Sequence, residues 1–281
     1  MNVFYFCARA FIRHICGVKG KGKLCLPVAG LNVFRQSVLL SAVLCVCVTP
    51  ATAQQPGDSL VVAEAAFCPR QLIVPSALIA VGAFGVDNGW FCSVKGQVRD
   101  GLQDLRGDCR FKADDYLQYL PVAANVGLGL AGAKTRHTLA EQLAATATAY
   151  AAMGLMVNVT KYAVGEKRPD SEARNSFPSG HTATAFMGAE LVREEYGTAY
   201  GSCAYAFATG IAVLRLYNDR HWLNDVIAGA GVGILSARIG YWLLPWERKL
   251  LGIGKAGTAV AVVPAYDYAN KGFGVSMAAS F

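Results

Sequence analysis

Charged residues are scarce in this chain of 281 residues, of which only 16% are Asp, Glu, Lys or Arg and 54% are hydrophobic. A chain this apolar is excluded from the disordered class and is typical of membrane helices or of a tightly packed helical bundle. The formal net charge of +7 is misleading, because six of the 26 basic residues lie in residues 1–53, which contain no acidic residue. The 20 basic residues that remain nearly balance the 19 acidic ones. The near-neutral body therefore predicts no nucleic-acid partner.

The cysteines lack the close spacing of a metal site. Five of the nine precede residue 54, and the others are Cys68, Cys92, Cys109 and Cys203. No two of these four have the short spacing of a zinc knuckle, so the sequence predicts no metal site through cysteine. Cys92 and Cys109 flank one polar loop, and a disulfide between them is an open alternative in an oxidising compartment.

The N-terminal residues 1–53 are typical of a targeting segment. Arg35 precedes an apolar run at 38–48, and residues 51–53 read Ala-Thr-Ala, the small-x-small pattern of a cleavage site. The apolar run is too short for a comfortable membrane span. We expect a leader that directs export, with an uncleaved signal anchor as the alternative.

Six apolar stretches, rich in alanine and glycine, follow in the body of the chain. This composition is typical of helices that pack closely against each other. We therefore predict an all-α fold over residues 54–250, a compact bundle of about six apolar helices embedded in a membrane. Several stretches are shorter than the roughly 20 residues that a span requires, so a soluble bundle is the alternative. The stretches are 71–86, 116–133, 143–164, 181–192, 200–216 and 222–244.

The pattern changes after residue 250. An apolar run at 259–263, the turn sequence Asn270-Lys271-Gly272 and a second run at 273–277 predict a β-hairpin. Residues 251–281 are therefore expected to form a short C-terminal tail, and the pattern does not indicate its role.

A helix start that suits anion binding lies at residues 176–181, which read Ser-Phe-Pro-Ser-Gly-His. Ser179 is a good N-cap residue, and Gly180 lets a backbone approach a ligand closely. The first N–H groups of a helix have no partner within it and can bind an anion, beside which His181 would stand. On its own, such a segment is more often an ordinary capped helix.

Two polar clusters flank this helix start in the sequence. Lys161 and Arg168 are separated by six residues, and two cations that converge on one spot would bind phosphate. A solvated basic loop has the same pattern. In the second cluster Arg215 precedes His221 and Asp225. On one helix face Asp225 would accept a hydrogen bond from one ring nitrogen of His221, which leaves the other nitrogen free to attack. A purely structural His–Asp pair is the alternative.

Taken together, the three clusters contain the parts of a phosphoryl-transfer site. Lys161, Arg168 and Arg215 would offset the negative charge that a phosphoryl group develops. His221 would be the nucleophile, and His181 would protonate the leaving oxygen. A bound phosphate would raise the pKa of His181, against the lowering effect of burial near a helix N-terminus.

The patterns Lys-x6-Arg-Pro, Pro-Ser-Gly-His and Arg-x5-His-x3-Asp, in this order, resemble the three signatures of the type 2 phosphatidic acid phosphatase superfamily. That superfamily also contains bacterial acid phosphatases and vanadium haloperoxidases. The resemblance covers residues 117–244 and implies a helical core that hydrolyses a phosphate monoester or pyrophosphate through a phosphohistidine, without a metal or other cofactor. It implies that His181 is the acid, His221 the nucleophile and Asp225 its partner. It also implies that the phosphate is bound by Lys161, Arg168, Ser179, Gly180 and Arg215.

The wider pattern resembles exported lipid phosphatases of Gram-negative bacteria, including lipid A phosphatases, in residues 114–121 and in the terminal hairpin. The implied substrate is a phosphorylated lipid: lipid A, an isoprenoid pyrophosphate or a phospholipid. One departure is Leu214, where the superfamily usually has a serine, so a hydroxyl contact is expected to be missing. The alternatives are a soluble periplasmic acid phosphatase of broad specificity, a vanadium haloperoxidase and a non-catalytic lipid-binding protein. The oligomeric state is not indicated.

The loops predict an orientation in the inner membrane. All three signatures lie on one face if the six stretches cross in turn, and the site would then face the periplasm, in agreement with export. Cleavage after Ala53 followed by six full spans would instead place the site inside. These expectations conflict unless 71–86 does not cross fully or the signal is not cut. The opposite face is marked as cytoplasmic by Lys134, Arg136, Arg193, Arg248 and Lys249.

Overall fold

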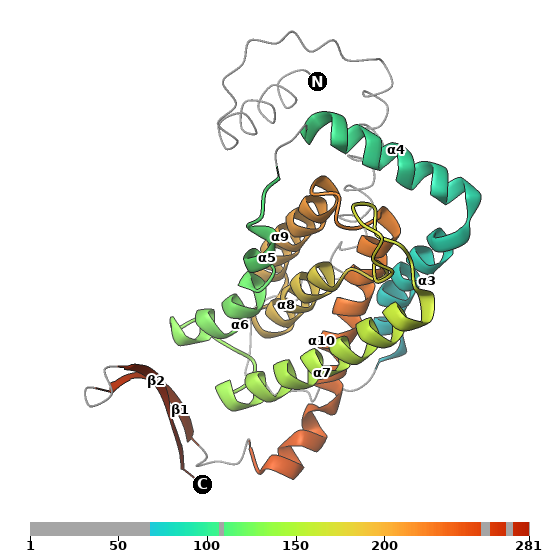
Figure 1. Cartoon of the computed structure of the whole chain (residues 1–281). Helices are drawn as coiled ribbons and strands as arrows, with labels where there is room; N and C mark the ends of the chain where they lie inside the picture. The colour runs from blue at the N-terminus through green and yellow to red at the C-terminus, as the bar shows by residue number, and fades with distance from the viewer. Residues whose placement is uncertain (1–67, 107–109, 254–258, 268–271, 281) are drawn as a thin grey trace.

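The fold is organised around one long, central helix. The computed structural model describes residues 68–106, 110–253, 259–267 and 272–280, and the predicted leader lies outside these ranges. The central helix α10 packs against α3, α7 and α8, and α8 in turn packs against α6 and α9 (Figure 1). The helices are η1 (Pro69–Leu72), α3 (Ile73–Asp87), α4 (Gly89–Arg106), α5 (Asp114–Leu117), α6 (Leu120–Leu130), α7 (Leu139–Val164), α8 (Gly180–Tyr196), α9 (Thr198–Tyr217) and α10 (Leu223–Leu251).

Glycine and alanine allow α8 and α10 to approach closely. A Cβ atom at Gly233 of α10 would collide with the carbonyl of Ala183, and one at Gly229 would lie 2.6 Å from the carbonyl oxygen of Ser179. Ala183 and Ser179, which face these two glycines, are fully buried. The contact at Gly229 presses the first turn of α8 onto α10, and it therefore fixes the second signature against the helix in which the third signature ends.

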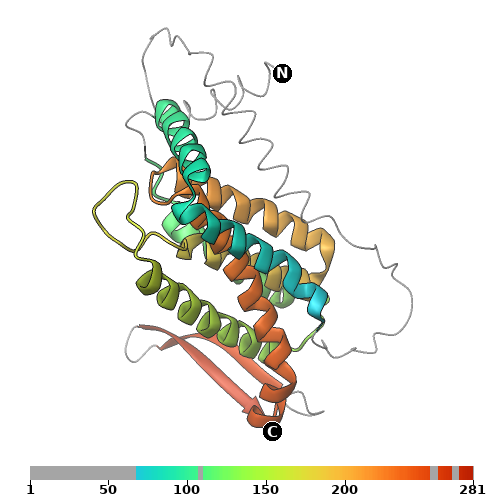
Figure 2. The ribbon, with the colours of Figure 1, turned by 90° about the vertical axis from the view of Figure 1, so that its right-hand side faces the viewer.

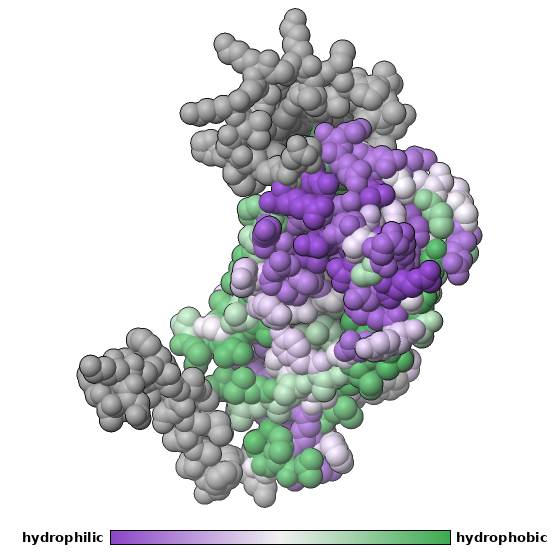
Figure 3. Space-filling model, in the orientation of Figure 1, coloured by the Kyte–Doolittle hydropathy of each residue, from purple (hydrophilic) through white to green (hydrophobic). Residues whose placement is uncertain are grey.

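The helical fold predicted for the body of the chain is confirmed. Three of the described helices are long and apolar enough to cross a membrane: Pro69–Asp87, Leu139–Val164 and Leu223–Leu251. Figure 3 shows hydrophilic residues gathered at the end of the bundle where α4 lies, while hydrophobic residues cover most of the remainder of that face. α6 is apolar but has only 11 residues, fewer than a span requires.

Helix α4 replaces what the sequence pattern suggested to be a polar loop. Its apolar side chains recur at helical spacing, and Phe91 and Val98 are buried against Leu223 and Ile227. Apart from the exposed Trp90 and Leu105, the other faces of α4 are largely polar, so its sequence resembles that of a loop. Cys92 lies in its first turn with a free thiol, whereas Cys109 lies outside the described residues.

Two strands follow the bundle. β1 (Ala259–Asp267) pairs antiparallel with β2 (Gly272–Ser280), in a register that places Ala259 opposite Ser280 and Asp267 opposite Gly272. The residues predicted to form the turn itself lie partly outside the described ranges.

Candidate functional site

The third signature brings His221 and Asp225 together at the start of α10. Asp225 lies in the first turn, and its Oδ2 atom lies 3.2 Å from Nδ1 of His221 and accepts a hydrogen bond from the backbone N–H of Trp222 at 2.9 Å. His221 precedes the helix instead of sharing its face, so the contact forms because Asp225 reaches back over the helix start. The carboxylate favours a proton on Nδ1 and leaves the lone pair of Nε2 available.

Burial keeps the His221 imidazole neutral. Only 4% of His221 is exposed. Burial, with the positive charges of Arg215, Lys161 and Arg168 nearby, holds the pKa of His221 well below its ordinary value. A neutral imidazole has the lone pair that a nucleophile requires.

Ser176 completes the surroundings of Asp225, and the sequence pattern did not assign it a role. Its hydroxyl donates to Oδ2 of Asp225 at 2.5 Å and lies 3.5 Å from Nδ1 of His221. Both Ser176 and Asp225 are fully buried. The serine is therefore part of the support of the His–Asp pair.

The second signature caps α8, as its residue types predict. Ser179 is the N-cap residue and accepts a hydrogen bond from the N–H of Thr182 at 3.4 Å. The N–H of Ser179 itself donates to the backbone oxygen of Asp225 at 3.0 Å, which ties the second signature to the third. Within the described part of the chain, the N–H groups of Gly180 and His181 form no hydrogen bond, so they are the donors that remain for an anion.

The first signature places its two cations at one asparagine. Helix α7 ends at Gly165, which has φ of 60°, and the chain then folds back. Lys161 Nζ donates to the backbone oxygen of Asn175 at 2.5 Å, and Arg168 Nε donates to the Asn175 side chain at 2.7 Å. Asn175 therefore joins the two predicted phosphate ligands, although no sequence pattern marked it.

Arg215 connects the third signature to the short helix α5. Its Nη1 donates to Asp114 at 2.7 Å and to Asp115 at 3.0 Å, while its buried Nε has no partner among the described residues. Asp115 Oδ1 also lies 3.0 Å from Nε2 of His181, so one carboxylate contacts a predicted phosphate ligand and the predicted acid. Residues 114–121 were part of the resemblance, but the roles of these aspartates were not predicted. Leu214, where a serine was expected, packs against the hydrophobic core.

The pKa of His181 is subject to opposing influences. Burial and the charge of Arg215 lower it, while the hydrogen bond and negative charge of Asp115 raise it, and the net direction is downward. His181 is partly exposed, unlike His221, and can exchange a proton with a bound molecule or with water.

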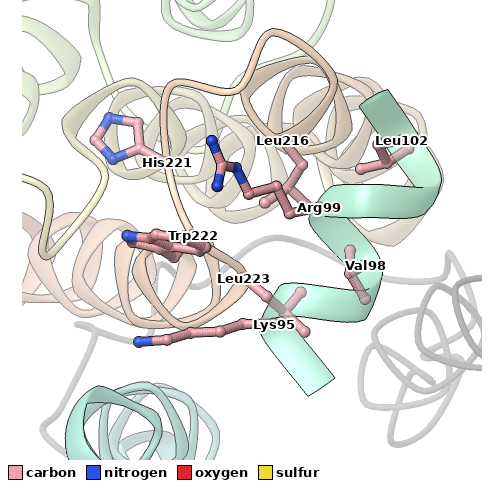
Figure 4. Close-up of a pocket in the computed structure, with 8 residues that line it drawn as sticks. All are labelled: Lys95, Val98, Arg99, Leu102, Leu216, His221, Trp222 and Leu223. Carbon is pink, nitrogen blue, oxygen red and sulfur yellow. The ribbon is translucent and has the colours of Figure 1, made fainter. Parts of the chain in front are cut away.

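Helix α4 covers the back of the site. Arg99 donates to the carboxylate of Asp219 at 2.8 Å and to the backbone oxygen of Pro169 at 2.8 Å. In the sequence, Asp219 lies within the third signature. Figure 4 shows Lys95 and Arg99 beside the Trp222 ring, and both cations lie within 5.4 Å of its centroid. α4 therefore binds the loops of the first and third signatures to each other.

The eight predicted site residues all lie at one end of the helical bundle. Cations from α7, from the following loop and from α9 surround the His–Asp pair at the start of α10. In the described part of the chain, no group of three His, Cys, Asp or Glu side chains is placed to hold a metal ion.

The fold and the site describe a helical protein with membrane-length helices and a cationic site built around a buried His–Asp pair. Residues 142–249, which contain most of this site, match the model of the PAP2 superfamily. The resemblance predicted from the three signatures is therefore confirmed.

Two curated proteins are similar to part of this chain. The chain is 41% identical to lipid A 1-phosphatase of Porphyromonas gingivalis over 154 residues. This alignment covers 52% of this chain and 35% of the relative. The chain is 38% identical to bacitracin transport permease protein BcrC of Bacillus licheniformis over 77 residues, an alignment that covers 27% of this chain and 37% of that relative. The chain spans about a third of the length of each.

A solved structure is also similar to this chain. It is the transmembrane PAP2 type phosphatidylglycerolphosphate phosphatase from Bacillus subtilis, with 18% sequence identity and a TM-score of 0.33. The similarity covers 82% of this chain and the whole of that one.

Proposed function

We propose that this protein is a membrane-bound lipid phosphatase that works through a phosphohistidine at His221. The observation that carries the proposal is the site itself: a buried, neutral histidine is held by Asp225 and surrounded by Lys161, Arg168 and Arg215. Fixed cations around a neutral nucleophile favour attack on a phosphoryl group, because they stabilise the charge of the transition state.

Each group has a role in this mechanism. The lone pair of His221 Nε2 attacks phosphorus, the bond to the leaving oxygen breaks, and His181 gives that oxygen a proton. His181, now neutral, then takes a proton from a water molecule that attacks the phosphohistidine. Inorganic phosphate leaves and both histidines return to their starting states. The free donors of Gly180 and the unpaired Nε of Arg215 are available to bind the phosphoryl oxygens.

A lipid A phosphate is the substrate that we propose first. Support comes from the 41% identity to a lipid A 1-phosphatase and from helices long enough to hold the site at a membrane surface. Isoprenoid pyrophosphates and phospholipid phosphates carry the same phosphate on an apolar anchor, and the phosphate-directed groups do not distinguish them. We also propose an inner-membrane location with the site facing the periplasm.

Phosphate release from purified protein tests the activity. Protein in detergent would be given lipid A with a 1-phosphate, phosphatidic acid, an isoprenoid pyrophosphate or para-nitrophenyl phosphate in parallel. We expect His221→Ala to lower release from the preferred lipid by at least about a thousandfold, because the nucleophile is lost. His137→Gln is the matched control, since His137 pairs with Glu195 and is not part of the site. Equal rates on the lipids and on para-nitrophenyl phosphate would favour a phosphatase of broad specificity.

Labelling that is quenched with denaturing detergent at alkaline pH tests the intermediate. With a substrate that carries radioactive phosphate, the parent and His181→Ala should retain an acid-labile label, and His221→Ala should retain none. An active His221→Ala variant would exclude the proposed mechanism.

A further inference from the structure

A second buried carboxylate lies behind the His–Asp pair. Glu166, within the first signature, accepts a hydrogen bond from Lys95 of α4 at 2.7 Å and another from the side-chain amide of Asn224 at 2.8 Å. Its side chain is only 9% exposed. These two donors come from different helices, α4 and α10, and each holds a different oxygen of the carboxylate, which fixes its orientation.

Asn224 connects Glu166 to Asp225. The same Nδ2 atom that donates to Glu166 lies 3.3 Å from Oδ1 of Asp225. The other oxygen of Asp225 is held by His221, Ser176 and the N–H of Trp222, whereas Asn224 donates to Oδ1. The Glu166 side chain also lies within hydrogen-bonding reach of the Asp225 carboxylate. The position of the Asp225 carboxylate therefore depends on the direction in which the Asn224 amide points.

Glu166 determines that direction. Asn224 is fully buried, and its Oδ1 atom has no partner within the described ranges. If the amide were reversed, its oxygen would face two carboxylates and would be repelled by both. With Glu166 in place, only the orientation that presents Nδ2 to Asp225 is favourable.

Lys95 stabilises the charged form of the buried Glu166 carboxylate. Burial and the nearby Asp225 raise the pKa of Glu166 to about 7, while Lys95 and Asn224 lower it. Lys95 is itself held by the backbone oxygens of Gly85 and Val86, at 3.4 and 3.3 Å. The support of the site thus extends to α4, outside the segment 142–249 that matches the superfamily.

We propose that Glu166 is a positioning residue which, through the amide of Asn224, holds the Asp225 carboxylate in the place where it orients His221. The proposal rests on the phosphatase function proposed above. Glu166 does not touch the phosphate, so its loss should slow the chemical step and leave substrate binding unchanged.

Steady-state kinetics of purified Glu166→Ala in detergent test this inference. We expect kcat to fall about tenfold or more with KM unchanged, because the variant loses the buried hydrogen bond between the Glu166 carboxylate and the Asn224 amide. Glu172→Ala is the matched control: Glu172 pairs with Lys167 at the same 2.7 Å, but its side chain is 90% exposed. The control should keep kcat within about twofold of the parent.

Two further variants separate positioning from a general structural role. Glu166→Gln keeps an oxygen that accepts from Asn224 and should recover most of the lost kcat, although it no longer pairs with Lys95. Asn224→Ala should lower kcat as much as Glu166→Ala does. The double variant should lower kcat no more than either single variant, because all three interrupt the same series of hydrogen bonds from Glu166 through Asn224 to Asp225. If Glu166→Ala does not fold, Asn224→Ala still tests this series.

The outcomes distinguish this inference from the function on which it rests. A parent protein that releases no phosphate from any of the four substrates would overturn the proposed function. An active parent with an unchanged Glu166→Ala, a rise in KM in place of a fall in kcat, or additive losses in the double variant would overturn only the positioning role.

Discussion

Asp225 depends on residues that lie far from it in the chain. One of its oxygens is held by Ser176, 49 residues away, and the other by Asn224, which is oriented by Glu166. Residue types and spacing were sufficient to predict that His221 and Asp225 would pair, since both belong to one signature. They were insufficient for Ser176, because a serine beside a helix cap has many ordinary roles and only the folded loop brings it to the carboxylate.

Asp115 should control the pH dependence of the reaction through His181. Its carboxylate raises the pKa of His181, against burial and Arg215, which lower it. Asp115→Asn removes that negative charge, so the pKa of His181 should fall further. Because the acid must be protonated to act, activity would be lost at a lower pH than in the parent.

The kcat profile between pH 5 and 9 measures this change. We expect the limb on the basic side to move toward lower pH in Asp115→Asn, while Asp104→Asn, on the exposed face of α4, leaves it in place. A limb that does not move would show that His181 is not the group that titrates there.

At the scale of elements, the apolar helices and the site motifs were predictable, but the helix that joins them was not. Alanine and glycine runs indicated α7 to α10 because apolar residues dominate them. α4 buries only Phe91 and Val98. Its contacts with the site join residues that are far apart in the sequence, by 71 positions for Lys95 and Glu166 and by 120 for Arg99 and Asp219. Lys95 and Arg99 carry no local signal of these partners, so no pattern within α4 could predict that it covers the site.

Close packing of α8 on α10 makes Gly233 sensitive to the smallest substitution. A Cβ atom there would collide with the backbone of α8 at Ala183, so Gly233→Ala should lower the free energy of unfolding by about 1–3 kcal/mol. Gly154→Ala in α7 is the matched control, since no neighbouring atom lies within 4 Å of its added Cβ. That change should be neutral or stabilising by up to about 1 kcal/mol, because alanine favours a helix more than glycine does. Thermal unfolding in detergent compares the two, and equal melting temperatures would contradict the tight contact.

The whole molecule has a polar end that contains the site and an opposite end where Lys134, Arg136, Arg193, Arg248 and Lys249 lie. α3 runs antiparallel to α10: Gly82 lies against Ala228 near the site, and Gln71 contacts Trp242 at 2.9 Å toward the other end (Figure 2). The candidate span Pro69–Asp87 therefore leads from the opposite end to the site end. If the site faces the periplasm, Pro69 lies on the cytoplasmic side. A leader cleaved after Ala53 would place the start of the mature chain outside, and the site would then face the cytoplasm.

Two single cysteines in an otherwise cysteine-free protein decide between these orientations. Glu172→Cys lies in the exposed loop after α7 at the site end, and Lys249→Cys lies in the last turn of α10 at the opposite end. With a maleimide that does not cross membranes, we expect spheroplasts to label position 172 at once and position 249 only after permeabilisation, because basic loops stay in the cytoplasm. The mass of the same protein reports whether residues 1–53 are still present. Labelling of position 249 from outside, together with a shortened chain, would place the site in the cytoplasm and would reverse both the proposed location and the proposed access to substrate.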